Sequence, residues 1–221
     1  MSDRHRLLRL FSAICLVSTL GGSMSADAGF LGFGGDSWKE EVLLHDGSTL
    51  IVNRSQSYGG RHEIGQPPPI KEHTITFTLP GSHNIITWTS EYGEDIGRTN
   101  FNPLALHILN GTPYIVVEPN LILSYNKWGR PNPPYVLFKY DGKAWQRIAI
   151  EELPAEFKNI NLVINTLAYG KQLDSQGLAS AEIVKKLNSS LTQEEYKTIL
   201  RTPIDYGPPR PPGRAQSRLL L

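Results

Sequence analysis

Cysteine is almost absent from this 221-residue chain, in which the single cysteine is Cys15. Cys15 lies in an N-terminal segment that we expect to be cleaved, so the mature chain would contain no thiol. A chain without thiols has no disulfide bond, no cysteine nucleophile and no thiolate ligand for a metal. Its stability would then depend on packing. Lipid attachment to Cys15 is not expected, because the preceding Ile14 is too large for that processing pattern.

The chain also lacks an excess of charge of either sign. The chain carries 22 Lys and Arg residues against 21 Asp and Glu residues, so its formal net charge is +1 at pH 7. Proteins that bind nucleic acid hold the phosphates with clustered Lys and Arg side chains. A nearly neutral chain therefore argues against nucleic acid as a partner.

Known catalytic motifs are missing as well. The sequence has no G-x-S-x-G and no P-loop, and no G-x-G-x-x-G motif opens a helix. Beyond the N-terminal segment the chain has five histidines, none at the close spacing of metal ligands, namely His45, His62, His73, His83 and His107. We therefore predict no metal and no cofactor, and the absence of motifs favours a binding protein over an enzyme.

No apolar run is long enough to span a bilayer. The longest one, Leu10–Leu20, is short against the roughly 20 residues that a membrane helix needs. A small-x-small pattern, Ala26-Asp27-Ala28, follows it, and three basic residues precede it, namely Arg4, Arg6 and Arg9. We predict that residues 1–28 are a signal peptide cleaved near Ala28. The mature protein would be periplasmic or secreted, with no integral membrane span.

The rest of the chain has the length of one domain. Residues 29–37 are rich in glycine and are interpreted as a flexible spacer. Residues 38–202 would form a single β-rich domain with a helical cap. Residues 203–221 contain five prolines and two glycines, which indicates a disordered tail.

The domain is composed largely of strand–turn–strand units. Turn signals such as Asp46-Gly47, Asn110-Gly111 and Asp141-Gly142 separate apolar stretches of strand length. Strands that pair with their sequence neighbours form antiparallel sheets. We predict a mainly β (α+β) fold with an antiparallel, hairpin-rich sheet, arranged as a sandwich or a partly closed barrel.

Two short helices are expected near the C-terminal end of the domain. Apolar residues at positions 183, 184, 187 and 191 recur on one helical face. Thr192 and Glu195 have the spacing of a capping box, and they would begin a second helix that carries Ile199 and Leu200. These helices would cover one face or edge of the sheet.

The first candidate site is a proline-stiffened loop that ends at Tyr135. It contains Trp128 and Arg130, with Asn126 and Asn132 on either side. An aromatic face with directional Arg and Asn groups is suited to a glycan or a protein. This leads to the hypothesis of a non-enzymatic envelope interaction module. The alternative is that Trp128 plugs the end of the sheet and Arg130 pairs with a carboxylate, which would make the loop purely structural.

The second candidate site is a glycine-flanked segment around His62. His62 would act with Glu63, Glu72 or Glu91 as the acid and base of a glycan- or peptide-directed hydrolase. Adjacent residues of a strand point to opposite faces, so His62 and Glu63 would not pair directly there. The alternative interpretation is a polar surface loop.

Three stretches carry a resemblance, namely WKEEVLLHDGS (38–48), GGRHEIGQPPPIKEH (59–73) and YNKWGRPNPPYVLFKYDGKAWQRI (125–148). They are similar to a family of uncharacterised secreted proteins of Gram-negative bacteria, over residues 38–201. The resemblance implies an envelope location, and it implies no activity, ligand or site residue.

Overall fold

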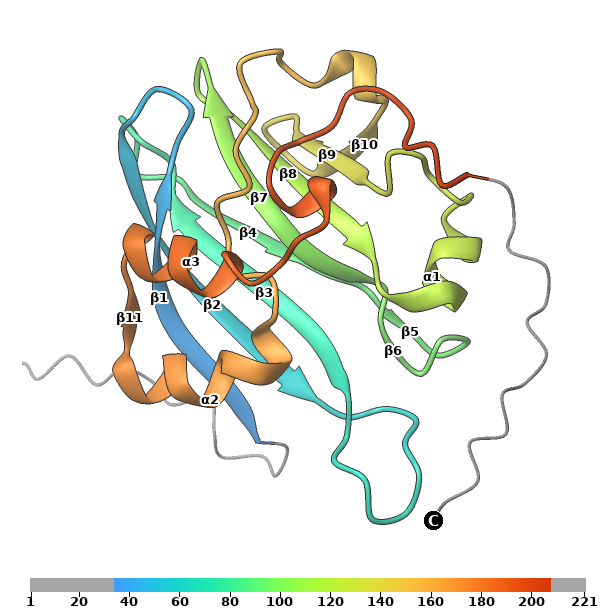
Figure 1. Ribbon diagram of the computed structural model, residues 1–221. Helices are drawn as coiled ribbons and strands as arrows, with labels where there is room; N and C mark the ends of the chain where they lie inside the picture. Colours follow the sequence, from blue (N-terminus) through green and yellow to red (C-terminus); the bar gives the residue numbers. More distant parts are fainter. Residues whose placement is uncertain (1–33, 208–221) are drawn as a thin grey trace, which may run out of the picture. The chain divides into compact units, whose positions relative to one another are not determined.

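The computed structural model describes residues 34–207 (Figure 1). The prediction of a mainly β fold is confirmed, since two antiparallel sheets form a sandwich-like arrangement with no closed barrel. The predicted signal peptide, and residues 208–221 of the predicted tail, lie outside the described residues and stay predictions.

The first sheet contains five strands in the order β11-β1-β2-β3-β4. Successive strands are antiparallel, whereas β11 runs parallel to β1. Their bounds are β1 (Gly35–Leu43), β2 (Thr49–Tyr58), β3 (Ile70–Thr78), β4 (Ile85–Thr89) and β11 (Leu178–Ala179).

The first strand begins inside the segment predicted to be a spacer. Gly35 pairs with Ser57 of β2, and a Cβ atom on Gly35 would lie 2.6 Å from the backbone oxygen of Gln56. Glycine is therefore required there for close approach between strands. The prediction of a flexible spacer is wrong for residues 35–37, because composition alone does not distinguish a flexible glycine from a closely packed one.

The second sheet contains four strands in the order β10-β9-β8-β7, all antiparallel. Their bounds are β7 (Phe101–Leu109), β8 (Thr112–Pro119), β9 (Val136–Tyr140) and β10 (Trp145–Ile148). A small ribbon of β5 (Tyr92–Gly93) and β6 (Arg98–Thr99) connects the two sheets along the chain. The Asn110-Gly111 turn joins β7 to β8 with positive φ at both positions, as the hairpin signal predicts.

The main core lies between the two sheets. Val52, Ile75 and Phe77 of the first sheet belong to the same buried cluster as Phe101 and Ile115 of the second. Burying one large apolar side chain contributes about 1.5–3 kcal/mol to stability. Buried and exposed positions alternate along the strands β1 to β4 of the first sheet, and this pattern sets the register of those strands.

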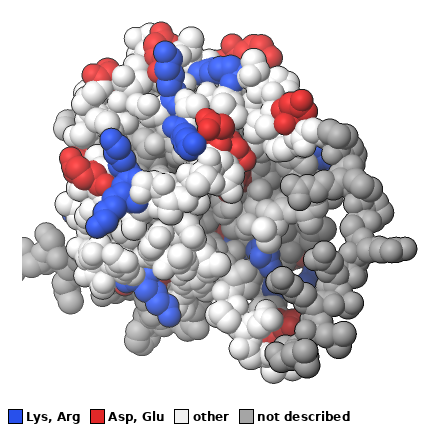
Figure 2. All heavy atoms as spheres, viewed as in Figure 1, with Lys and Arg blue, Asp and Glu red and all other residues white. Residues whose placement is uncertain are grey.

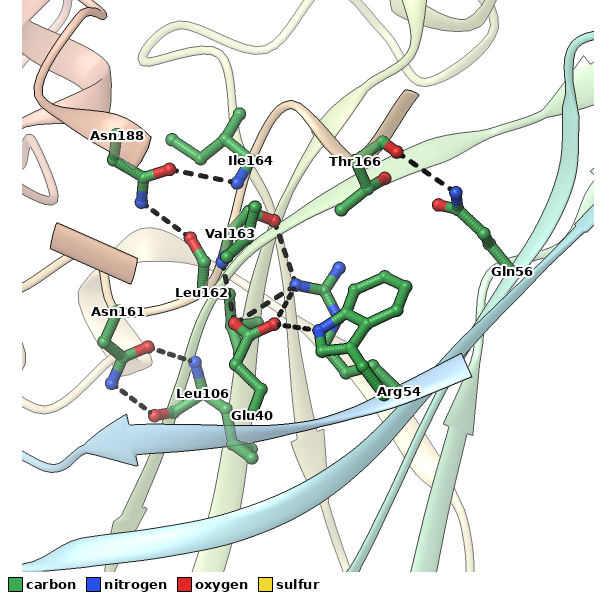
Figure 3. Close-up of polar contacts among 11 residues, drawn as sticks. Glu40, Arg54, Gln56, Leu106, Asn161, Leu162, Val163, Ile164, Thr166 and Asn188 are labelled. Atoms are coloured by element: carbon green, nitrogen blue, oxygen red, sulfur yellow. Dashed lines mark hydrogen bonds and ion pairs between the residues drawn. The ribbon is translucent and has the colours of Figure 1, made fainter. Parts of the chain in front are cut away.

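A buried polar network fastens residues 161–166 against the sheets (Figure 3). The Glu40 carboxylate accepts hydrogen bonds from Arg54 at 3.0 Å, from the Trp38 indole at 2.8 Å and from the Val163 backbone at 2.7 Å. The Asn161 amide donates to the carbonyls of Leu106 and Leu43, which belong to different sheets, and accepts from the Leu106 N–H. These groups replace water at sites that the fold encloses.

Two segments, residues 149–160 and residues 196–201, cover the outer face of the second sheet. Leu153, Phe157 and Ile199 pack there on buried residues of β7, β8 and β9. The Arg201 guanidinium donates to the carbonyls of Leu153, Pro154 and Phe157 at 2.6–2.9 Å. This arrangement gives the sandwich a third layer.

Two short helices lie in the C-terminal third, as predicted, but one of them is in an unexpected place. The helix α3 (Ala181–Asn188) is present, whereas residues 192–200 contain only the single 3-10 turn η3 (Glu194–Tyr196). The helix stops there because the Ile199 N–H donates to the Lys158 carbonyl, and Thr198 pairs with Asn159 as a β-bridge. Long-range pairing takes precedence over the capping signal.

The other helix, α2 (Thr166–Gln176), was not predicted. Its sequence, TLAYGKQLDSQ, has no marked apolar stripe, so helical periodicity gave no signal. Leu173 of α2 and Val184 of α3 pack with Trp38 and Ala179 against the edge of the first sheet (Figure 1). The two helices thus cover the β11–β1 edge of the first sheet.

Candidate functional site

A short helix, α1 (Leu121–Lys127), leads from the end of β8 into the proline-stiffened loop (Figure 1). One face of this segment is held by the buried residue Asn100. The Asn120 N–H donates to the Asn100 carbonyl at 2.7 Å, the Ser124 hydroxyl donates to the same carbonyl, and the Trp128 indole donates to the Asn100 side-chain oxygen at 3.1 Å. Positions four residues apart share one side of a helix, so that side is fixed to the fold.

Trp128 is half-buried and its ring contacts the protein on two sides. The ring centres of Phe101 and Trp128 lie 4.5 Å apart, and the Arg147 guanidinium lies 5.5 Å from the Trp128 ring centre. A half-buried ring with these neighbours anchors the loop, as in the structural alternative for Trp128. It offers little free face on which a sugar ring would stack.

Asn132 and Tyr135 also contact the protein's own backbone. The Asn132 amide exchanges two hydrogen bonds with the Ile204 backbone, at 2.9 and 2.7 Å. Tyr135 is buried, and its hydroxyl donates to the carbonyls of Glu195 and Thr198. Both side chains therefore tie later segments of the chain to the loop, and residues 203–204 of the predicted tail belong to this packed structure.

Arg130 and Asn126 remain at the surface. Arg130 Nε donates to the Asn126 side-chain oxygen at 2.8 Å, and no ion pair to Arg130 occurs within residues 34–207. The expected pairing of Arg130 with a carboxylate is therefore not seen. Asn126, Arg130 and Asn132 are the exposed members of the predicted loop site, and of these Asn132 is bonded to the Ile204 backbone.

The sequence reasoning missed the apolar residues at the start of α1. Leu121, Ile122 and Leu123 are 61%, 65% and 53% exposed. Leu121 also has φ of +62°, a conformation that costs energy for a side chain branched beyond Cβ. Three consecutive apolar residues after Asn120 were a visible signal, but such residues are normally buried, so their exposure was not predictable.

His62 lies on the exposed loop between β2 and β3. Its Nδ1 is 2.9 Å from the Gly60 carbonyl, and Glu63 accepts a hydrogen bond from Gln66 at 3.3 Å. Among residues 34–207, no hydrogen bond or ion pair joins His62 to Glu63, Glu72, Glu91 or any other carboxylate. The hydrolase hypothesis required such a pair across a pocket, so the geometry favours the polar surface loop.

Beside α1 lies a crevice with a volume of about 380 Å³. It opens between the ends of β7 and β8, the start of β3, and residues 164–167. The Glu118 carboxylate in its wall accepts from the Asn102 amide at 3.1 Å and the Tyr196 hydroxyl at 2.8 Å. Burial raises the pKa of Glu118 and that of Tyr196. Leu121 belongs both to this wall and to the exposed start of α1.

Comparisons with family models, with curated proteins and with solved structures found no match to this chain. The resemblance to secreted Gram-negative proteins therefore stays a prediction. No group of three or more potential metal ligands gathers within residues 34–207. In the same part of the chain, no helix combines the length and apolar character that a membrane span requires.

Proposed function

We propose that this protein is a non-enzymatic interaction module that binds a protein partner through the α1 surface. We define the α1 surface as the solvent-facing side chains of Leu121, Ile122, Leu123, Asn126 and Arg130. The observation that carries the proposal is the run of three exposed apolar side chains at the start of α1. Contiguous exposed apolar groups with polar neighbours are typical of protein–protein contact sites.

The anchoring of α1 supports a binding role. Asn100 and Trp128 hold the inner face of the segment, so the outer face keeps its shape without a partner. A preorganised surface loses less conformational entropy when it binds. The positive φ of Leu121 adds local strain at the same place, and strain of this kind is concentrated at functional sites.

A protein partner is favoured over a glycan. The α1 surface supplies aliphatic side chains, whereas glycan sites present an aromatic face to the sugar ring. The ring of Trp128 already contacts Phe101 and Arg147. Acidic and basic side chains are interspersed on the face in Figure 2, without a field of one sign. Recognition would thus rest on local apolar contact with directional bonds from Arg130 and Asn126.

The proposed place of action is the cell envelope, which follows from the predicted signal peptide. The partner would be an envelope protein with an apolar patch of its own. No catalytic step is proposed, because the geometry around His62 lacks a hydrogen-bonded acid–base pair.

The test is crosslinking in intact cells, followed by mass spectrometry of what is attached to the protein. We expect a partner of the wild type to be lost from the Ile122→Ser, Leu123→Ser double variant. Ile85→Ser is the matched control, because Ile85 is 72% exposed on β4, far along the chain from α1. Equal attachment of the same partner to the wild type and the double variant would contradict the proposal.

A further inference from the structure

The crevice beside α1 combines two opposite charges that have no charged partner within residues 34–207. Glu118 lies at the end of β8 and Arg98 lies on β6, and both line the same 380 Å³ space. Neither residue belongs to any ion pair in the described part of the chain, which also means that they do not pair with each other. Of the α1 surface, only Leu121 reaches the crevice.

Glu118 has the unused acceptor capacity that a cation requires. Each carboxylate oxygen accepts one hydrogen bond from a neutral donor, Asn102 or Tyr196. An ionised carboxylate has about four acceptor positions, so two remain for a ligand. Burial is the main cause of the raised pKa of Glu118, and the hydrogen bonds from Tyr196 and Asn102 offset it only in part. A cationic group in the crevice would supply the missing compensation.

Arg98 offers the complementary group. Its side chain makes no hydrogen bond or ion pair with residues 34–207, although it is partly buried in the crevice wall. A guanidinium carries five N–H donors in a planar fork that matches a carboxylate. An anionic group is therefore the ligand that Arg98 is suited to hold.

Apolar side chains line the rest of the space. They come from four separate parts of the chain, and they are Ile70, Leu121, Ile164, Leu167 and Leu191. Small-ligand sites typically combine such apolar walls with a few placed polar groups in a volume of about 300–1,000 Å³. The walls would accommodate an aliphatic side chain beside the two charged groups of a ligand.

We propose that this crevice binds a small zwitterion whose primary ammonium contacts Glu118 and whose carboxylate contacts Arg98, with its aliphatic part against the apolar walls. A free aliphatic amino acid and a short aliphatic peptide share this chemistry. The site shares only Leu121 with the proposed partner surface, since Ile122 and Leu123 do not line it.

Calorimetric titration of the full chain with four probes tests the proposal. The probes are L-leucine, leucyl-leucine, leucinamide, which lacks the carboxylate, and N-acetyl-leucine, which lacks the ammonium. The wild type is expected to bind one of the two zwitterions at least about tenfold more tightly than either blocked leucine, a difference of about 1.4 kcal/mol. Whichever of L-leucine and leucyl-leucine binds more tightly shows whether the site takes a free amino acid or a short peptide.

Two charge-removing variants assign the groups. Glu118→Gln retains the size and hydrogen-bonding shape of the side chain. This variant should bind N-acetyl-leucine and L-leucine with equal affinity. Arg98→Gln should bind leucinamide and L-leucine with equal affinity. Lys127→Gln, which removes an exposed charge of α1 outside the crevice lining, should behave as the wild type.

The proposal is overturned if the wild type binds none of the four probes, or binds the blocked and free forms equally. It is also overturned if Glu118→Gln and Arg98→Gln, folded as judged by circular dichroism, discriminate between the probes as the wild type does. Neither result bears on partner crosslinking through Ile122 and Leu123, so the two proposals fail independently.

Discussion

The Glu40 side chain shows how strongly one buried charge depends on its neighbours. It lies beside Arg54 on the buried face of the first sheet, and each of its oxygens accepts more than one hydrogen bond. Enclosing two charges is costly, and only close pairing with additional donors compensates for it. Removing one partner therefore affects stability more than the pair itself contributes.

We predict that Glu40→Gln lowers the free energy of unfolding by about 3–5 kcal/mol, because Arg54 then remains as an uncompensated buried charge. Urea denaturation measures the change. Lys127→Gln removes the exposed pair with Asp95 at 3.1 Å and should leave the free energy of unfolding nearly unchanged. Similar losses for the two variants would contradict the assigned role of Glu40.

Trp128→Ala should lower the free energy of unfolding by about 3 kcal/mol, as truncation of a large packed aromatic does. The variant loses the contact with Phe101 and the hydrogen bond to Asn100. Thermal and urea unfolding provide the measurement. A loss below about 0.5 kcal/mol is typical of an ordinary surface site, and it would refute the anchoring role.

The role of Trp128 was not predictable from its local sequence. The prolines after it indicated a stiff loop, and that much followed from the residues themselves. Whether the ring packs or faces a partner depends on Asn100 and Phe101, which lie in another part of the chain. Likewise, the exposure of Ile122 depends on which side of α1 the fold anchors.

At the scale of elements, the buried residue Asn100 supplies three of the hydrogen bonds that attach the α1 segment. Asn100 contacts three positions of the α1 segment with its carbonyl and its side chain, and its amide nitrogen donates to the Glu91 carbonyl at 2.8 Å. The orientation of α1, and with it that of the α1 surface, follows from this arrangement.

Asn100→Ala should loosen α1 while leaving both sheets intact. The variant loses the side-chain bonds to Trp128 and Glu91 and leaves buried groups unpaired, which costs about 1–3 kcal/mol. Hydrogen exchange should accelerate at the amides of Trp128 and Arg130. Asn126→Ala is the matched control, since Asn126 is exposed and should leave exchange at Trp128 unchanged. Equal exchange in both variants would contradict this account.

Elements formed by local interactions were the ones that the sequence predicted. The hairpin at Asn110-Gly111 depends on a two-residue turn between two apolar runs of strand length. The helix α2 was missed because its stability comes from packing on β1, where Gly170 allows close approach to Asp36 and Gln56. The predicted helix at 192–200 gave way to pairing with residues 158–159.

At the scale of the whole molecule, two buried histidines link stability to pH. Burial lowers the pKa of His73 to about 3, assisted by the nearby positive charge of Arg54. Burial likewise lowers the pKa of His107 to about 4. An unfolded histidine has a pKa of about 6.5. Below that pH the unfolded chain binds protons that the folded chain does not, so acid favours unfolding.

The free energy of unfolding should therefore be insensitive to these histidines above pH 6.5 and should fall as the pH decreases toward 4. The slope approaches about 1.4 kcal/mol per pH unit for each histidine. Urea denaturation across this range provides the measurement. His73→Leu should reduce the slope, because it removes one of the two buried titrating groups. The fold should tolerate leucine there, since neither ring nitrogen of His73 has a hydrogen-bond partner in the described chain. An unchanged slope in His73→Leu would contradict the prediction.

The proposed binding of a protein partner through the α1 surface can be tested at a single position. Ile122 is replaced with a photo-activatable amino acid in the native host, and the same replacement at Ile85 serves for comparison. We predict one discrete crosslinked product from position 122 that disappears with Leu123→Ser, and no such product from position 85. Equal products from the two positions, or none from position 122, would contradict it.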